Sequence, residues 1–262
     1  MLRVFALEFS VLLFKIVLAP VMIALVSLAG RKWGAAFSGW LLGIPFSSGP
    51  ILFFLALEQG PQFAASTAIG SLLGIIGWGA FTVVYARCCF KLPWWWSTLI
   101  GWAAYFAVAA AILPLHSGEI ASFVLVCVAL AVILLGFPHV SPPPERGTYG
   151  KYDLVLRMVT ASIMVVTLTG FARLLGPMRS GILSAFPAYT TILAVFSHRQ
   201  HVAAAANTMK GVAIGLYTAA TFFLILSPAL LRMNLAAAFA LATLGALAVQ
   251  FASLIYVRRR LS

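Results

Sequence analysis

Long apolar runs separated by short polar segments dominate the chain. We count nine such runs, at about residues 8–29, 34–57, 63–86, 95–114, 119–137, 154–175, 177–197, 203–226 and 235–257. Several exceed the roughly 18 apolar residues that predict a membrane-spanning helix. The alternating pattern of half-buried strands is absent from the sequence. The pattern therefore predicts an all-α polytopic bundle of about nine transmembrane helices.

The composition agrees with this prediction. Of the 262 residues, 63% are hydrophobic and 8% are charged, whereas a soluble domain carries roughly 25% charged residues. The mean hydropathy is +1.07. So few charges cannot cover a water-facing surface, so we expect the lipid bilayer to surround this protein.

The formal net charge is +12, and its distribution predicts an orientation. With the N-terminus outside, ten basic residues at loops and span ends face the cytoplasm and four face outward. Lys and Arg collect on the cytoplasmic side of membrane proteins, so we predict an N-out, C-in, multi-pass protein of the bacterial inner membrane. No basic stripe with interleaved aromatic residues is present, and we expect no nucleic-acid partner.

Two of the apolar runs carry helix-breaking residues near their middle. Residues 43 to 50 read G-I-P-F-S-S-G-P, and residues 184 to 191 read S-A-F-P-A-Y-T-T. Proline removes a helical hydrogen bond and frees a carbonyl group. In lipid that carbonyl needs a partner, so such a break should face protein or a water-filled cavity.

The two broken segments also match each other in register, and the match extends along the chain. At a constant offset Lys15 meets Arg157, Arg31 meets Arg173, Gly34 meets Gly176, Pro45 meets Pro187 and Phe54 meets Phe196; after a one-residue deletion Gly70 meets Gly211, Gly74 meets Gly215 and Phe81 meets Phe222. The copies lie five spans apart, an odd number, and therefore predict an inverted-topology repeat. We expect a 4+1+4 arrangement: a first repeat (1–114), a linker helix with a proline-rich loop (115–152) and a second repeat (153–262).

Matched broken helices point to a substrate site near the membrane midplane. The candidate residues there are the two prolines and the hydroxyl groups that follow them: Pro45, Ser47, Ser48, Pro187, Tyr189, Thr190 and Thr191. The alternative is a plain kink whose freed carbonyls bond to these hydroxyls. The faces Gly70-x-x-x-Gly74 and Gly211-x-x-x-Gly215 predict tight helix packing, with a hinge as the alternative.

Lys15 and Arg157 lie about one turn inside the first and sixth spans. A cation inside the membrane either snorkels to the headgroups or has a function. In the functional reading, this matched pair contacts an anionic substrate or a lipid phosphate.

Recognisable catalytic chemistry is missing from the sequence. The five carboxylates are all expected near span ends: Glu8, Glu58, Glu119, Glu145 and Asp153. Proton or sodium coupling often uses an acid within the membrane, and none is expected here. Catalytic triads, metal-ligand spacings and phosphate-binding loops are also missing, so we expect no enzymatic activity, cofactor or metal.

The second copy, G-I-L-S-A-F-P-A-Y-T-T-I-L-A-V-F-S-H-R followed by the Gly211 span, resembles the repeat of small GlpM-type membrane proteins. The likeness covers roughly residues 171 to 230 and is fainter over 29 to 88, where Ile44 replaces the phenylalanine before Pro45. The resemblance implies a link to exopolysaccharide production and supplies no catalytic residue. The architecture is also similar to the drug/metabolite transporter superfamily, whose tenth span is missing here.

These observations predict a secondary transporter or facilitator of a small neutral or anionic solute. Alternating access would occur around the broken second and seventh spans. The alternative is an accessory membrane subunit for envelope polysaccharide or lipid-linked export. A homodimer or an envelope-complex partner is compatible with either function.

Overall fold

The computed structural model describes residues 20–46, 48–115, 118–139, 152–172 and 177–261. This part of the chain is helical throughout, with short connections. After a helix over residues 20–33, the elements are α2 (Ala35–Leu41), α3 (Ser48–Gln59), α4 (Pro61–Cys88), α5 (Trp94–Ile112), α6 (Glu119–Leu135), α7 (Asp153–Ala172), α8 (Pro177–Ser184), α9 (Ala188–Gln200), α10 (Val202–Arg232) and α11 (Leu235–Leu261).

Five segments of the described chain are long and apolar enough to cross a membrane. They are α4, α5, α10, the first 20 residues of α11 and the combined segment Pro177–Gln200. The apolar helix α6 has 17 residues and is slightly shorter. These lengths and compositions are compatible with a multi-pass membrane protein, and the count of nine spans stays a prediction.

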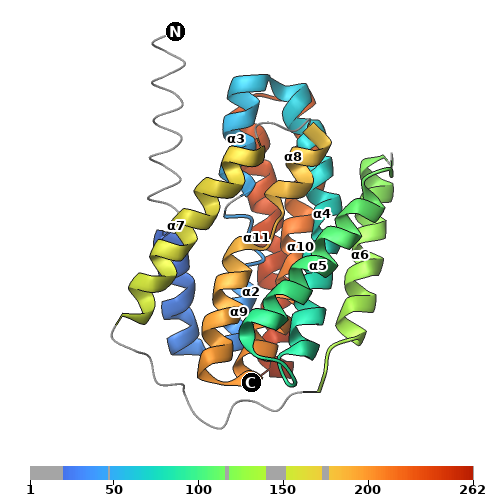
Figure 1. Ribbon diagram of the computed structural model, residues 1–262. Coiled ribbons are helices and arrows are strands. Elements are labelled where there is room, and N and C mark those ends of the chain that lie inside the picture. The colour runs from blue at the N-terminus through green and yellow to red at the C-terminus, as the bar shows by residue number, and fades with distance from the viewer. Residues whose placement is uncertain (1–19, 47, 116–117, 140–151, 173–176, 262) are drawn as a thin grey trace.

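The helices run side by side in one bundle around a central pair (Figure 1). That pair is α4 and α10, which share the largest helix–helix contact in the described part of the chain. Helix α2 packs on α10 and α8 packs on α4, while α5 covers α4 and α11 covers α10. Helix α6 touches both central helices. The contact of α2 with α10 thus corresponds to that of α8 with α4, and the contact of α5 with α4 corresponds to that of α11 with α10.

Glycines bring the backbones of these helices into direct contact. A Cβ atom added to Gly39 in α2 would overlap the carbonyl oxygen of Thr208 in α10. A Cβ atom added to Gly181 in α8 would overlap the carbonyl oxygen of Thr67 in α4. The sequence register pairs Gly39 with Gly181 and Thr67 with Thr208, so matched residues make the same contact with exchanged partners.

The glycines of the central helices behave in the same way. Gly211 leaves room for the carbonyl group of Ala36, and Gly70 leaves room for the carbonyl group of Met178. Small residues at helix crossings allow the close approach that stabilises helix association in lipid. The tight-packing interpretation of the glycine faces is therefore confirmed at Gly70 and Gly211.

The expected interruptions are present, and both have the same backbone form. The N–H of Phe46 donates to the carbonyl of Ile44 at 2.7 Å, and the N–H of Ala188 donates to the carbonyl of Phe186 at 2.8 Å. Each bond spans one proline. Pro187 has φ −77° and ψ 54°, which are the angles of an inverse γ-turn.

Local bonds satisfy the carbonyl groups that the prolines leave without their helical partner. The carbonyl of Leu41 accepts from the N–H of Ile44, and the carbonyl of Leu183 accepts from the N–H of Phe186, each at 3.1 Å. Each helix tightens to a 3₁₀ turn before it breaks. The donors to these two carbonyl groups are therefore backbone N–H groups and not the hydroxyl groups of serine and threonine.

Replacing Gly39 or Gly181 with alanine should destabilise the protein by about 1–3 kcal/mol, because each methyl group meets rigid backbone. The apparent Tm of detergent-purified protein measures this loss. Gly49→Ala is the matched control, because the nearest atom to its added Cβ is Cζ of Phe222 at 3.7 Å. An unchanged Tm in both test variants would contradict the close backbone contact.

Candidate functional site

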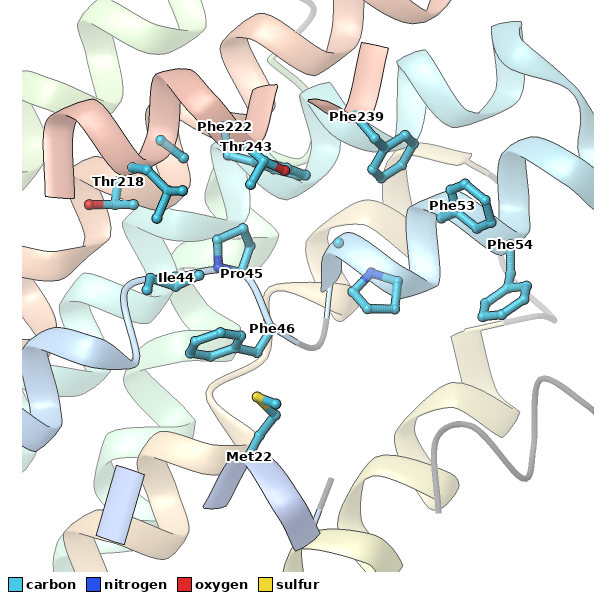
Figure 2. A pocket seen from close by; sticks show the side chains of 14 residues that line it. Met22, Ile44, Pro45, Phe46, Phe53, Phe54, Thr218, Phe222, Phe239 and Thr243 are labelled. Atoms are coloured by element: carbon cyan, nitrogen blue, oxygen red, sulfur yellow. The ribbon is translucent and has the colours of Figure 1, made fainter. Parts of the chain in front are cut away.

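A cavity of about 480 Å³ lies beside the first proline break. Figure 2 shows Ile44, Pro45 and Phe46 on one side of it and the side chains of α10 and α11 opposite. Its lining comes from the helix over 20–33 (Met22), the break (Ile44, Pro45, Phe46), α3 (Gly49, Pro50, Phe53, Phe54), α10 (Thr218, Phe222) and α11 (Phe239, Thr243, Ala246, Leu247). Residues of both predicted repeats therefore form the cavity.

The cavity wall is apolar and carries no charged side chain among the residues that line it. Phe239 packs edge-on against Phe53, with ring centroids 5.3 Å apart, and lies 6.1 Å from Phe222. The hydroxyl groups of Thr218 and Thr243 are the polar side-chain groups of this wall. Such a wall suits an apolar molecule with few polar groups.

A buried polar network lies behind Thr218. Its hydroxyl donates to Oε1 of Gln250, and Nε2 of Gln250 donates to the carbonyl oxygen of Trp40 at 3.1 Å. Gln250 is 3% exposed and Thr218 is fully buried. An amide at this depth costs free energy unless it is hydrogen-bonded, so the network ties α10 and α11, which line the cavity, to α2.

The hydroxyl groups after the second break are bonded to tryptophans. Nε1 of Trp78 donates to Oγ1 of Thr190 at 3.0 Å, and Nε1 of Trp102 donates to Oγ1 of Thr191 at 3.1 Å. The hydroxyl of Thr191 in turn donates to the carbonyl of Pro187 at 2.8 Å. These interactions tie α9 to α4 and α5.

The structure thus places the predicted residues unequally. Pro45 lines the cavity, and Ser48 is buried close by at the start of α3. Pro187 and Tyr189 are buried at the second break and do not line the cavity. Ser47 and Lys15 lie outside the described residues. The two broken elements meet where α2 contacts α9.

Arg157 is buried, with 3% of its surface exposed, and lies outside the cavity wall. Its Nε donates to Oδ2 of Asp153 at 3.0 Å, and its guanidinium lies 4.7 Å from the centre of the Phe196 ring. Arg31 also pairs with Asp153, at 3.6 Å. Arg157 is thus held within the protein by an acidic and an aromatic partner.

The sequence interpretation missed Thr218, Ala246 and Gln250, which lie in the eighth and ninth apolar runs. The repeat register contains a signal for them: at the offset of Gly74 and Gly215, the first residue of α5, Trp94, corresponds to the first residue of α11, Leu235, and the last residue of α5, Ile112, corresponds to Ser253. No group of three or more His, Cys, Asp or Glu residues within the described ranges could hold a metal ion.

Comparisons with known proteins give no match from which a function could be transferred. No protein-family model matches the chain, and neither the curated proteins nor the solved structures give a match. Fold and cavity define an all-helical protein compatible with several membrane crossings. The GlpM-type resemblance stays a prediction based on the residues quoted above.

Thr190→Val should lower the apparent Tm, because it leaves the buried N–H of Trp78 without its acceptor. A hydrogen bond within a membrane protein contributes about 0.6–1.7 kcal/mol. Thr190→Ser keeps the acceptor and should restore most of the loss. The matched control is Ser48→Ala. In the register Ser48 corresponds to Thr190, and Ala219 corresponds to Trp78, so no tryptophan N–H donates to Ser48. An equal loss in Thr190→Val and Thr190→Ser would argue against the hydrogen bond.

Asp153→Asn should destabilise the protein strongly, because it removes a carboxylate that pairs with the buried charge of Arg157. Breaking a buried ion pair on one side costs about 3–5 kcal/mol. The double variant Asp153→Asn, Arg157→Gln should recover part of the loss. Thermal unfolding of both variants in detergent measures the difference. A double variant no more stable than Asp153→Asn would show that the pairing is unimportant.

Proposed function

We propose that this protein is a secondary transporter or facilitator in the bacterial inner membrane, with its N-terminus outside and its C-terminus inside. The observation that carries the proposal is the cavity at the first proline break. Transporters bind substrate near the midplane where two repeats meet, beside interrupted helices. The cavity has both properties, because its wall combines Pro45 with residues of α10 and α11.

Two features support an inverted repeat within this proposal. The inverse γ-turns at Pro45 and Pro187 have the same hydrogen bonds at matched positions. The glycine contacts of α2 on α10 recur for α8 on α4 with matched residues exchanged. A duplicated unit inserted twice in opposite orientations would produce both features.

The solute we propose is small and neutral. Charged side chains are missing from the residues that line the cavity, and Arg157, the described cation proposed as a ligand, is paired with Asp153. An anionic solute would have to use Lys15, which the described structure does not place. Of the two solutes expected from the sequence, neutral or anionic, the cavity wall thus favours the neutral one.

Movement would occur at the first break. At the second break, Trp78 and Trp102 hold Thr190 and Thr191. The register pairs these tryptophans with Ala219 and Thr243, which have no ring N–H to donate. The two tryptophan bonds that hold α9 therefore have no counterpart at α3, and we propose that α3 tilts about Pro45 to expose the cavity alternately to each side.

Alternating access can be tested with a single cysteine at Thr243, after Cys88, Cys89 and Cys127 are replaced with alanine. A membrane-impermeant maleimide should modify the Thr243→Cys variant in right-side-out and in inside-out vesicles, because water reaches the cavity from each side in turn.

Leu244→Cys is the matched control for this experiment. Leu244 is the next residue of α11, and 66% of its surface is exposed on the outside of the bundle. It should stay unmodified, because a thiol in lipid does not ionise and reacts poorly. Modification of the Thr243→Cys variant from one side or from neither would contradict alternating access and favour the accessory-subunit function.

A further inference from the structure

At the second proline break, aromatic side chains occupy the space that is equivalent to the cavity. Tyr105, which is fully buried, packs edge-on against Phe186 with ring centroids 5.2 Å apart. Trp102 and Phe106 lie 5.7 Å and 5.6 Å from the same ring. Four aromatic rings, three from α5 and one from the turn itself, therefore pack together at the second break.

The repeat register gives smaller residues at all four positions in the other half. Phe186 corresponds to Ile44, Trp102 to Thr243, Tyr105 to Ala246 and Phe106 to Leu247. Each of these four smaller residues lines the cavity. The cavity is thus the volume that the aromatic rings occupy in the second half.

The hydrogen bonds of the two halves differ in a corresponding way. The hydroxyl of Tyr105 donates to the carbonyl of Ile182. The matched carbonyl is that of Trp40, which accepts from Gln250, one turn further along α11 than Ala246. The amide of Gln250 thus supplies the donor that the missing tyrosine would have supplied. Thr218 donates to this amide and lines the cavity, whose other threonine, Thr243, is exposed.

We infer that the cavity binds a neutral amphiphile with a flat, apolar ring body and one hydroxyl group. The Trp102 and Tyr105 side chains are the internal counterpart of this ligand in the second half. Its ring would lie against Phe222 and Phe239, and its hydroxyl would donate to the hydroxyl oxygen of Thr243, the exposed threonine of the wall, which has two lone pairs for acceptance. The inference rests on the proposed function and names the substrate class of that site.

The test uses the full chain in detergent and three probes of similar size: 2-naphthol, naphthalene and 2-naphthalenesulfonate. A ligand that binds the folded state raises the apparent Tm in a saturable way. We expect 2-naphthol to raise it. Naphthalene, which lacks the hydroxyl, should need about two- to tenfold more compound for an equal shift. The sulfonate should give no shift, because the wall offers its charge no partner.

Two variants fill the cavity with the side chains of the other half. Ala246→Tyr and Thr243→Trp should each abolish the 2-naphthol shift, and the fold should tolerate them because the matched positions already hold these residues. Leu244→Trp adds the same ring outside the bundle and should leave the shift unchanged. The Tm without ligand shows whether each variant is folded, and either filling variant alone suffices for the test.

The outcomes separate this inference from the proposed function. A 2-naphthol shift that persists in a folded filling variant overturns the assignment to the cavity. Naphthalene or the sulfonate binding as well as 2-naphthol, and lost in the same variants, overturns the ligand class and leaves the transport proposal standing. No saturable shift with any probe overturns the inference, while the cysteine experiment at Thr243 decides alternating access independently.

Discussion

Direct backbone contact between α2 and α10, and between α8 and α4, is the constraint on which the other features depend. In lipid the hydrophobic effect does not drive helices together, so association relies on close packing. Gly39 and Gly181 provide it by bringing each short helix onto the backbone of a long one. These anchors lie only a few residues before Pro45 and Pro187, so they hold the end of each short helix against a long helix next to the break.

The two proline breaks have the same backbone hydrogen bonds and differ in the side chains that surround them. Both breaks have the same turn and the same local hydrogen bonds. Around Phe186 the volume beyond the turn is filled with rings, whereas beside Ile44 it stays open. A half filled with rings and a half with a cavity thus share the same turn at the proline, and they differ in a few side chains on α5 and α11.

Much of this arrangement could be predicted from the sequence, because proline and glycine act through the backbone. Pro45 and Pro187 predict the breaks, and Gly70 and Gly211 predict the close crossings. The cavity could not be predicted from single residues, since its wall consists of ordinary apolar side chains such as Ala246 and Leu247. The cavity lies where α11 has a small side chain, Ala246, at the position that matches the large Tyr105 of α5. The pairing of Arg157 with Asp153 was also missed: Asp153 was expected near a span end, and it begins α7 one turn before Arg157.

Helix α6 has a consequence for the surrounding bilayer. With 17 residues it is about 26 Å long, whereas the hydrocarbon layer is about 30 Å thick. Its neighbour α10, with 31 residues, reaches about 46 Å. Ile120 and Leu135, near the two ends of α6, are strongly exposed on the outside of the bundle. Such hydrophobic mismatch is relieved when lipids thin beside the short helix. The membrane next to α6 would therefore be locally thinner than its surroundings, and the protein would favour thin bilayers over thick ones.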